Sequence, residues 1–368
     1  WNAPLMQLTV YSCILLISWI GAQLIVSSGA TTFTTGDLMS MLSYCMNILM
    51  SLMMLSMVFV MITMSMASAR RVAEVLDEQS DLTNGEDPVM EVRDGSVRFD
   101  HVSFAYKKDG EKALEDIDLD IKSGETIGII GGTGSAKSTL VNLIARLYDV
   151  TEGTVRVGGV DVRNYDLDAL RHQVAMVLQK NVLFSGTIAE NLRWGDPNAT
   201  DEEVRKAAHL ACADEFVDGF PKGYDTWIEQ GGSNVSGGQK QRLCIARALL
   251  RRPKILILDD STSAVDTKTD AKIREGLASY LPNTTKLIIA QRISSVQDAD
   301  RIIVMEGGRI KDIGNHDELL KTSEIYRETF TSQNKMSAED EEAAETAAAD
   351  TEASSPQAQT QEGGEAHE

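Results

Sequence analysis

The sequence predicts an α-helical transmembrane hairpin, then an α/β domain built around a Gly-rich loop, then a disordered acidic tail. Three observations support this. Two long uncharged segments open the chain, strand and helix patterns alternate up to about residue 334, and the residues after 336 hold ten Asp or Glu and no Lys or Arg. Alternating strands and helices are typical of a largely parallel sheet covered by helices.

The N-terminal segments are long and apolar enough to cross a bilayer twice. No charged residue occurs from Trp1 to Gly36, and 32 uncharged residues run from Leu38 to Ala69. A bilayer core needs about 20 apolar residues in a helix, so the second segment should continue as a helix beyond the membrane. A cleaved signal peptide would be shorter, with a basic start. A buried helical hairpin of a soluble core is the alternative.

Charge predicts how the hairpin is oriented. Arg70 and Arg71 follow the second segment, and basic residues favour the cytoplasmic side. Both ends of the hairpin are then cytoplasmic, and Asp37 lies outside, at the end of the turn "GATTFTTGD". The second segment holds ten of the fifteen Met. Flexible thioethers fill gaps between helices and also adapt to varied ligands, so ordinary packing and a substrate-facing surface both remain open.

Composition limits the classes of partner and of site. The formal net charge is −20, much of it in the tail, which lacks aromatic and branched apolar residues and is expected to be a disordered, solvated spacer. This acidity argues against nucleic acid as a partner. Cys13, Cys45, Cys212 and Cys244 show no paired spacing, and the five His show no metal-ligand spacing. Neither a disulfide framework nor a zinc site is expected.

A linker and a first strand precede the Gly-rich loop. The stretch "LDEQSDLTNGEDPVMEVRDG" is rich in Asn, Gly, Asp and Pro, which is typical of a linker. The stretch "SVRFDHVSFAY" then alternates between apolar and polar residues, as a strand with one exposed face does.

The segment "ETIGIIGGTGSAKSTLVNLIARLYD" combines a buried strand, a Gly-rich turn and an amphipathic helix. Glycines let backbone N–H groups close around phosphate oxygens, and the helix N-terminus adds its dipole. Lys137 is expected between the β- and γ-phosphates, and Ser138 is expected to offer its hydroxyl to Mg²⁺. Ala136 replaces the usual Gly; because Ala accepts negative φ, the expected perturbation is modest. The residues predicted to bind nucleotide are Gly131, Gly132, Thr133, Gly134, Ser135, Ala136, Lys137, Ser138 and Thr139.

Two adjacent carboxylates follow another apolar run. In "PKILILDDSTSAVD", the run from Ile255 to Leu258 precedes Asp259 and Asp260. Such a pattern predicts a buried strand that delivers an acid to a site at the C-terminal edge of the sheet.

With further motifs in order, the chain resembles an ATP-binding cassette (ABC) exporter half-transporter over about residues 1–334. The resemblance implies an ATP-binding cassette with a helical subdomain. It implies that Tyr106 in "VSFAY" stacks on adenine, and that Gln179 in "VAMVLQKNVLF" approaches Mg²⁺ and contacts the membrane domain. It also implies that Asp259 supports Mg²⁺, and that Ser263–Asp266 form the D-loop.

The stretch "VSGGQ" matches the family signature, with Val in place of the usual Leu. Its residues are Val235, Ser236, Gly237, Gly238 and Gln239. Ser and glycines just before a helix turn N–H groups and the helix dipole toward an anion. In the family two cassettes dock head to tail, so the signature would contact the γ-phosphate bound to a partner. The resemblance therefore implies a dimer with two ATP sites, each built from both chains.

Three residues around the nucleotide depart from the family pattern. Ala136 replaces a Gly, Asp260 stands where the family has its catalytic Glu, and Gln291 in "IIAQRISS" stands where it has its switch His. Aspartate is one methylene shorter, and a misplacement of about 1 Å can cost about 10²-fold in rate. Gln cannot exchange a proton near neutral pH. The departures favour a site that binds ATP but hydrolyses it poorly; independent drift in a still active site is the alternative.

These patterns lead to one organisation and three functional hypotheses. Residues 1–75 would be the last two transmembrane helices of an exporter membrane domain, 76–334 the ABC nucleotide-binding domain, and 335–368 the acidic tail. The first hypothesis is the degenerate half of a heterodimeric exporter in a bacterial plasma membrane, multi-pass, with cassette and tail cytoplasmic. Its intact signature would complete the active site of a second half-transporter. A homodimeric active exporter and an ATP-binding regulatory subunit are the rivals.

The number of predicted transmembrane helices indicates how much of an exporter half this chain contains. An exporter half of this family normally has six spans, so Trp1 is expected to be a truncation point. Substrate identity would lie mostly in the other helices, and drugs, lipids and peptides all remain open.

Overall fold

The computed structural model describes residues 2–29, 31–107, 110–261 and 265–335. The chain divides into two compact units, Trp1–Asp81 and Leu82–Glu368. The expected acidic tail beyond residue 335, Trp1, and the D-loop residues Ser263 and Ala264 lie outside the described residues.

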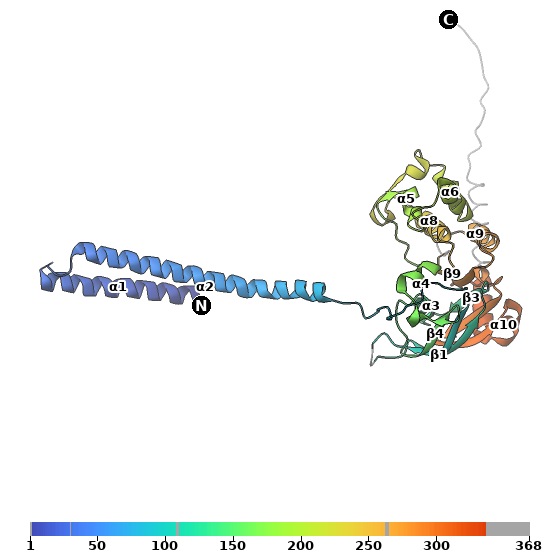
Figure 1. Cartoon of the computed structure of the whole chain (residues 1–368), viewed down its shortest axis with the longest axis horizontal. Coiled ribbons are helices and arrows are strands. Elements are labelled where there is room, and N and C mark those ends of the chain that lie inside the picture. The colour runs from blue at the N-terminus through green and yellow to red at the C-terminus, as the bar shows by residue number, and fades with distance from the viewer. Residues whose placement is uncertain (1, 30, 108–109, 262–264, 336–368) are drawn as a thin grey trace, which may run out of the picture. The chain divides into compact units, whose positions relative to one another are not determined.

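The first unit is a hairpin of two long helices, drawn in blue in Figure 1. Helix α1 spans Asn2–Ser28 and α2 spans Thr35–Asp77. Both are long and apolar enough to cross a membrane, with mean hydropathies of 1.9 and 2.2. Only 6% and 0% of their apolar windows are buried, whereas a helix from a soluble core would be mostly buried. The exposed faces therefore favour a membrane hairpin over a soluble core.

Local chemistry explains how the hairpin turns. Thr34 caps α2, because its hydroxyl accepts a hydrogen bond from the Asp37 N–H while the Asp37 carboxylate accepts one from the Thr34 N–H. Asp37 thus belongs to the first turn of α2 rather than to the loop. Gly21 faces Leu38 so closely that an added Cβ would collide with the leucine side chain.

The centre of the second unit is a six-stranded sheet. Its order is β12-β11-β3-β10-β9-β6, and all neighbouring pairs are parallel except β11 with β12. Strands β9 and β10 are buried along their whole length, as expected for a parallel sheet covered on both faces. The strands are β3 Thr126–Gly131, β6 Val174–Val177, β9 Ile255–Asp259, β10 Thr285–Ile289, β11 Arg301–Glu306 and β12 Arg309–Gly314.

A second, antiparallel sheet was not expected from the sequence. Its order is β2-β1-β4-β5, formed by β1 Val97–Phe104, β2 Leu114–Ile121, β4 Glu152–Val157 and β5 Val160–Asp161. Gly158 and Gly159 join β4 to β5, with φ of +55° and +80°. Two glycines with positive φ between short apolar strands are a hairpin signal, so the sequence did contain a sign of this sheet.

Helices fill both sides of the cassette. Helix α3 packs between the two sheets, while α5, α6 and α8 form a separate helical lobe, green to yellow in Figure 1. This lobe is the helical subdomain, and the predicted fold class is confirmed. The helices are α3 Lys137–Ile144, α4 Leu167–Gln173, α5 Ile188–Arg193, α6 Asp201–Leu210, α7 Asp214–Val217, α8 Gly237–Leu250, α9 Thr267–Tyr280 and α10 His316–Thr322. The short strands β7 Gly186–Thr187 and β8 Trp227–Ile228 pair within the lobe.

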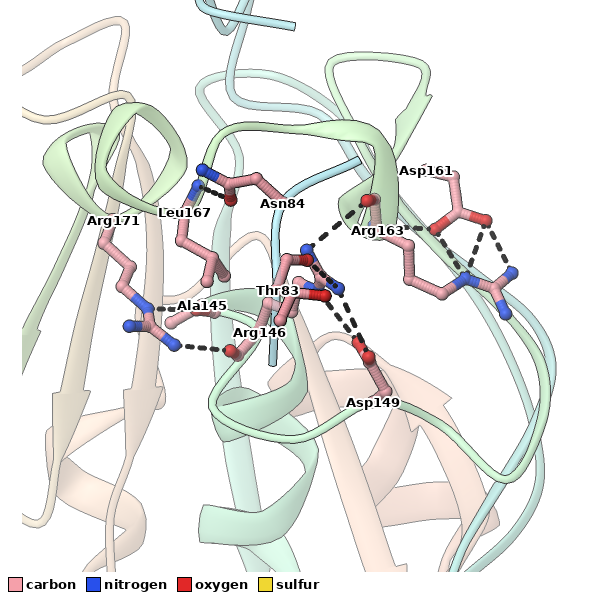
Figure 2. Close-up of polar contacts among 9 residues, drawn as sticks. All are labelled: Thr83, Asn84, Ala145, Arg146, Asp149, Asp161, Arg163, Leu167 and Arg171. Atoms are coloured by element: carbon pink, nitrogen blue, oxygen red, sulfur yellow. Dashed lines mark hydrogen bonds and ion pairs between the residues drawn. The ribbon is translucent and has the colours of Figure 1, made fainter. Parts of the chain in front are cut away.

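Part of the predicted linker is bound tightly to the cassette, as Figure 2 shows. The guanidinium of Arg146, which is buried, donates to the Thr83 carbonyl over 3.2 Å. The Asn84 side chain donates to the Asp166 carboxylate over 2.5 Å and accepts from the Leu167 N–H over 3.0 Å. The segment before β1 is therefore held at the start of α4 and by Arg146 after α3.

Candidate functional site

Four neighbouring parallel strands bring the predicted site residues to one edge of the sheet. The Gly-rich loop follows β3, Gln291 follows β10, Asp259 ends β9 with Asp260 directly after it, and Gln179 follows β6. The C-terminal edge of a parallel sheet is the usual position of ligand sites in α/β proteins. The sequence positions alone, spread over more than a hundred residues, could not show this order of strands.

The loop after β3 closes around the ammonium group of Lys137. Its Nζ donates to the Gly131 carbonyl over 2.7 Å, to the Gly132 carbonyl over 2.9 Å and to the Ser135 hydroxyl over 3.2 Å. Gly131 is required here, because an added Cβ would collide with the Met305 carbonyl. Burial lowers the pKa of Lys137, although the nearby acids oppose that shift.

The expectation for Ala136 was wrong. Its φ is +66° and its ψ is +26°, the left-handed conformation that favours Gly, and it is the N-cap of α3 with no side-chain capping bond. A left-handed conformation costs a residue with a Cβ roughly 1–2 kcal/mol. The loop thus still needs the left-handed backbone conformation that suits glycine at this position. Ala136 adopts this conformation under strain.

The loop presents its middle residues outward. Gly132, Thr133, Gly134 and Ser138 are exposed, whereas Ser135 and Thr139 are buried. Backbone groups and the Ser138 hydroxyl are accordingly accessible to a phosphate ligand.

Tyr106 lies beside the Gly-rich loop. Its hydroxyl is 2.9 Å from that of Thr139, and the residue is 55% exposed. The ring meets Phe104 and Tyr148 edge-on, with centroids 4.9 and 5.2 Å away. An exposed aromatic next to a phosphate loop can stack on a base. Sequence reasoning missed Tyr148, which supports the ring, although it follows closely after the helix of the loop.

The two acids at the end of β9 are both 8% exposed, but they differ in conformation. Asp259 ends the strand, whereas Asp260 adopts φ +48° and donates its backbone N–H to the Ile289 carbonyl of β10 over 2.9 Å. Asp is among the residues that tolerate the left-handed region.

Two glutamine amides converge on one oxygen of Asp260. Gln291 Nε2 lies 2.5 Å from Asp260 Oδ2, and Gln179 Nε2 lies 3.2 Å from the same atom. Gln241 of α8 also donates to the Asp260 backbone carbonyl, over 3.3 Å. Asp260, Gln291 and Gln179, the three positions expected to act on the γ-phosphate region, thus form one hydrogen-bonded group. Gln241 was missed by sequence reasoning, and its place in the first half of α8 gives no signal of this contact.

Burial raises the pKa of the Asp260 carboxyl group, and Asp259 adds to that effect. The bonds from Gln179 and Gln291 act in the opposite direction, because they stabilise the charged form. Asp260 is therefore a desolvated acid restrained by amides rather than one solvated by water.

The residues expected to hold Mg²⁺ carry suitable donor groups. Mg²⁺ prefers oxygen ligands and commonly uses one or two carboxylates together with substrate phosphates. Asp259 supplies a carboxylate and Ser138 a hydroxyl, while Gln179 has its amide nitrogen on Asp260, which leaves its carbonyl oxygen for a metal. Within the described residues, no cluster of three or more His, Cys, Asp or Glu side chains forms a separate metal centre.

The signature residues begin α8 in the helical lobe. Ser236 is the N-cap, and its hydroxyl accepts from the Gln239 N–H over 3.3 Å while the Gln239 side chain accepts from the Ser236 N–H over 3.0 Å. Ser236 and Gly237 are exposed, Gly238 is half-buried, and Val235 packs against the core of the lobe. Gln239 thus serves the cap itself, as the Ser-x-x-Gln spacing indicates.

The turn before the signature has a local structural explanation. Gly231 and Gly232 both have φ of +70°, which side chains with a Cβ rarely adopt. Asn234 closes the turn by accepting from the Glu229 N–H and donating to the Trp227 carbonyl.

Of the D-loop, the described part includes Asp266, which caps α9 through the Thr269 N–H.

Comparison with known proteins shows what the second unit is similar to. Residues 114–263 match the family model described as ABC transporter. The chain is 42% identical over 330 residues to the ABC transporter ATP-binding protein YfiB of Bacillus subtilis, which covers 90% of this chain and 56% of YfiB. It is 44% identical over 275 residues to YgaD of the same organism, named as a multidrug export ATP-binding/permease protein, which covers 74% and 47%. The chain spans about half the length of these relatives.

A solved structure shares the fold. The structure of a bacterial Atm1-family ABC exporter with ATP bound matches with a TM-score of 0.75 at 32% sequence identity. The match covers 89% of this chain and 57% of that chain.

Proposed function

Because the chain combines a helical hairpin with an α/β ABC cassette in the Atm1-family exporter fold, we propose that it is one half of an ATP-driven exporter of a bacterial plasma membrane. The hairpin crosses the bilayer as part of a multi-pass membrane domain, and the cassette and the tail are cytoplasmic. Relatives named for multidrug export support a multidrug-type substrate.

ATP and Mg²⁺ bind at the edge of the six-stranded sheet. Tyr106 stacks on adenine, the Gly131–Thr139 loop binds the phosphates, and Asp259, Ser138 and Gln179 hold Mg²⁺. The exposed Tyr106 ring beside Thr139 and the oxygen-rich donor set support these roles. When bound, Mg²⁺ would neutralise charge on the β- and γ-phosphates.

This site binds ATP but hydrolyses it slowly, and one observation carries that conclusion. The Asp260 carboxylate, at the catalytic position, accepts hydrogen bonds from Gln291 and Gln179 on one oxygen. A general base must reach the water whose proton it takes. Asp260 is short and restrained by two amides, and Gln291 cannot relay a proton. Gln291 instead hydrogen-bonds the γ-phosphate, and the bound ATP acts as a long-lived clamp.

The partner is a second ABC half-transporter that provides the competent site. The exposed N-terminus of α8 at Ser236 and Gly237 faces the γ-phosphate of the ATP on that partner. The capping box uses the N–H groups of Ser236 and Gln239, and it leaves those of Gly237 and Gly238 at the start of this 14-residue helix for an anion. The signature is retained because the partner's hydrolysis depends on it.

Nucleotide trapping in the assembled pair tests the proposal. After several turnovers with labelled ATP, this site should retain uncleaved ATP, and changing the partner's catalytic Glu to Gln should reduce turnover by roughly 10²–10⁴-fold. Asp260→Glu with Gln291→His should raise hydrolysis here, and the two single variants are the matched controls because such effects need not add.

A homodimeric active exporter is the second candidate, in which the Asp260 carboxylate, next to Asp259 at the end of β9, still serves as the base. A large loss of turnover on Asp260→Asn alone, with the partner intact, would establish Asp260 as a working base and this candidate as the better account. A pair that binds ATP yet never hydrolyses it would point instead to a regulatory subunit.

A further inference from the structure

The helical residues 324–335 reach the loop that carries Gln291. Gln333 donates its Nε2 to the Gln291 carbonyl over 2.7 Å and accepts from the Ile293 N–H at its Oε1 over 2.9 Å. One side-chain amide thus binds backbone groups on both sides of Arg292. Such a two-bond contact fixes both the position and the orientation of the loop.

The helix that carries Gln333 is itself firmly anchored. Tyr326 is fully buried, burial raises its pKa to about 12, and its hydroxyl lies 2.6 Å from His316 Nδ1. Ser323, just before the helix, donates its hydroxyl to the Asp312 carboxylate over 2.6 Å. The helix that carries Gln333 is therefore held in a fixed position on the cassette.

The inner face of this helix and the loop share one hydrophobic core. Tyr326, Phe330 and Gln333 are spaced by four and three residues, which places them on one helix face. Tyr326 and Ile293 belong to the same buried cluster, and Phe330 packs against it. Gln333 is the polar residue at the C-terminal end of this otherwise apolar helix face. It lies next to the Gln291 carbonyl and the Ile293 N–H of the loop.

The loop is held at its other end by the sheet. The Ala290 N–H donates to the Ile129 carbonyl of β3 over 3.2 Å. Between this bond and the two from Gln333, the Gln291 side chain extends to Asp260. Three backbone anchors thus bracket the residue whose amide reaches the catalytic position.

We propose that Gln333 is a positioning residue for the ATP site, which holds the backbone of Gln291 so that the Gln291 amide lies at Asp260 and toward the γ-phosphate. This inference rests on the proposed role of Gln291. Loss of Gln333 then weakens recognition of the γ-phosphate and leaves adenine, α- and β-phosphate binding intact. A residue that only stabilised the fold would not separate ATP from ADP in this way.

The test compares Mg-ATP and Mg-ADP affinities of the full 368-residue chain in detergent. Gln333→Met keeps the size of the side chain but removes both hydrogen bonds. It should lower the preference for ATP over ADP about 2- to 10-fold, the range for one or two hydrogen bonds, with ADP affinity unchanged. Asn334→Ala, at an exposed neighbouring position, is the matched control. Gln333→Glu, which keeps the acceptor for Ile293 but not the donor to Gln291, should give an intermediate loss.

A double variant separates the possible failures. Gln291→Ala alone should lower the preference for ATP, and adding Gln333→Met should lower it no further, because the side chain being positioned is gone. If Gln291→Ala has an effect but Gln333→Met has none, or if the two effects add, the positioning role is overturned. If Gln291→Ala itself leaves the preference unchanged, the proposed contact with the γ-phosphate is wrong and the inference falls with it.

Discussion

The side-chain amide of Gln291 donates a hydrogen bond to Oδ2 of Asp260 over 2.5 Å. The two residues are 31 positions apart and follow neighbouring strands β10 and β9. Their contact means that the departures from the family pattern at these positions form one physical unit. An amide that donates to the carboxylate stabilises its charge and restrains its orientation, and both effects are expected to hinder its use as a base.

The first prediction concerns the charge of Asp260. Burial raises the pKa of Asp260 above its ordinary value of 3.8, so the folded state holds the proton more tightly than the unfolded chain does. The protonated carboxyl group of Asp260 then adds to the stability of the folded state in full below that ordinary value. This contribution to stability is lost as the pH rises through the raised pKa. Asp260→Asn removes the charge, and Asn tolerates the φ of +48°.

We therefore expect Asp260→Asn to raise the melting temperature at pH 7, because the variant buries no charge at this position. The gain should shrink on acidification toward pH 4. Thermal unfolding of the full chain across this pH range measures both. A gain that is constant with pH would show that the charge of Asp260 is not its cause.

The second prediction concerns Ala136. Ala136→Gly should relieve the left-handed strain at φ +66° and increase stability by roughly 0.5–1 kcal/mol, after allowing for the greater freedom of Gly in the unfolded chain. Chemical denaturation measures the gain. Ala145→Gly, at the other end of α3 where φ is −81°, is the matched control and should destabilise. Equal effects at the two positions would contradict the strain at Ala136.

The third prediction separates the ring of Tyr106 from its hydroxyl. Tyr106→Ala should weaken ATP binding by roughly 1–3 kcal/mol, the range for a base stacked on an aromatic side chain. Tyr106→Phe keeps the exposed ring and loses only the bond to Thr139, so its affinity should stay close to that of the parent chain. Titration of the purified chain with ATP measures both. If Phe were as harmful as Ala, the hydroxyl contact would be the important feature.

The fourth prediction concerns Ser236 at the start of α8. In the proposed pair, Ser236→Arg should remove most ATPase activity, because the cation and its bulk would block the partner's γ-phosphate. Loss of the capping bond alone costs about 1 kcal/mol of helix stability, so Ser236→Ala is the control for that effect. Activity retained in the Arg variant would argue against a head-to-tail dimer.

The sequence by itself determined the features that depend on local pattern. An uncharged run of the length of a bilayer predicts a span wherever it occurs. A strand, a Gly-rich turn and a helix around Lys137 predict a phosphate loop, and a Ser-x-x-Gln spacing predicts the capped start of α8. Each of these signals lies within one short segment, so neither strand order nor packing is needed to recognise it.

Only the tertiary structure decided which distant groups meet. The order β3-β10-β9-β6 brings the phosphate loop, Gln291, Asp260 and Gln179 to one edge, and no local pattern encodes that order. The left-handed backbone of Ala136 is set by the shape of the loop around Lys137, which overrides the preference of alanine. Gln333 reaches the Gln291 loop only because Tyr326 anchors its helix in the core that also contains Ile293. Contacts between segments depend on how the whole chain packs, and this is why they could not be predicted from the residues that make them.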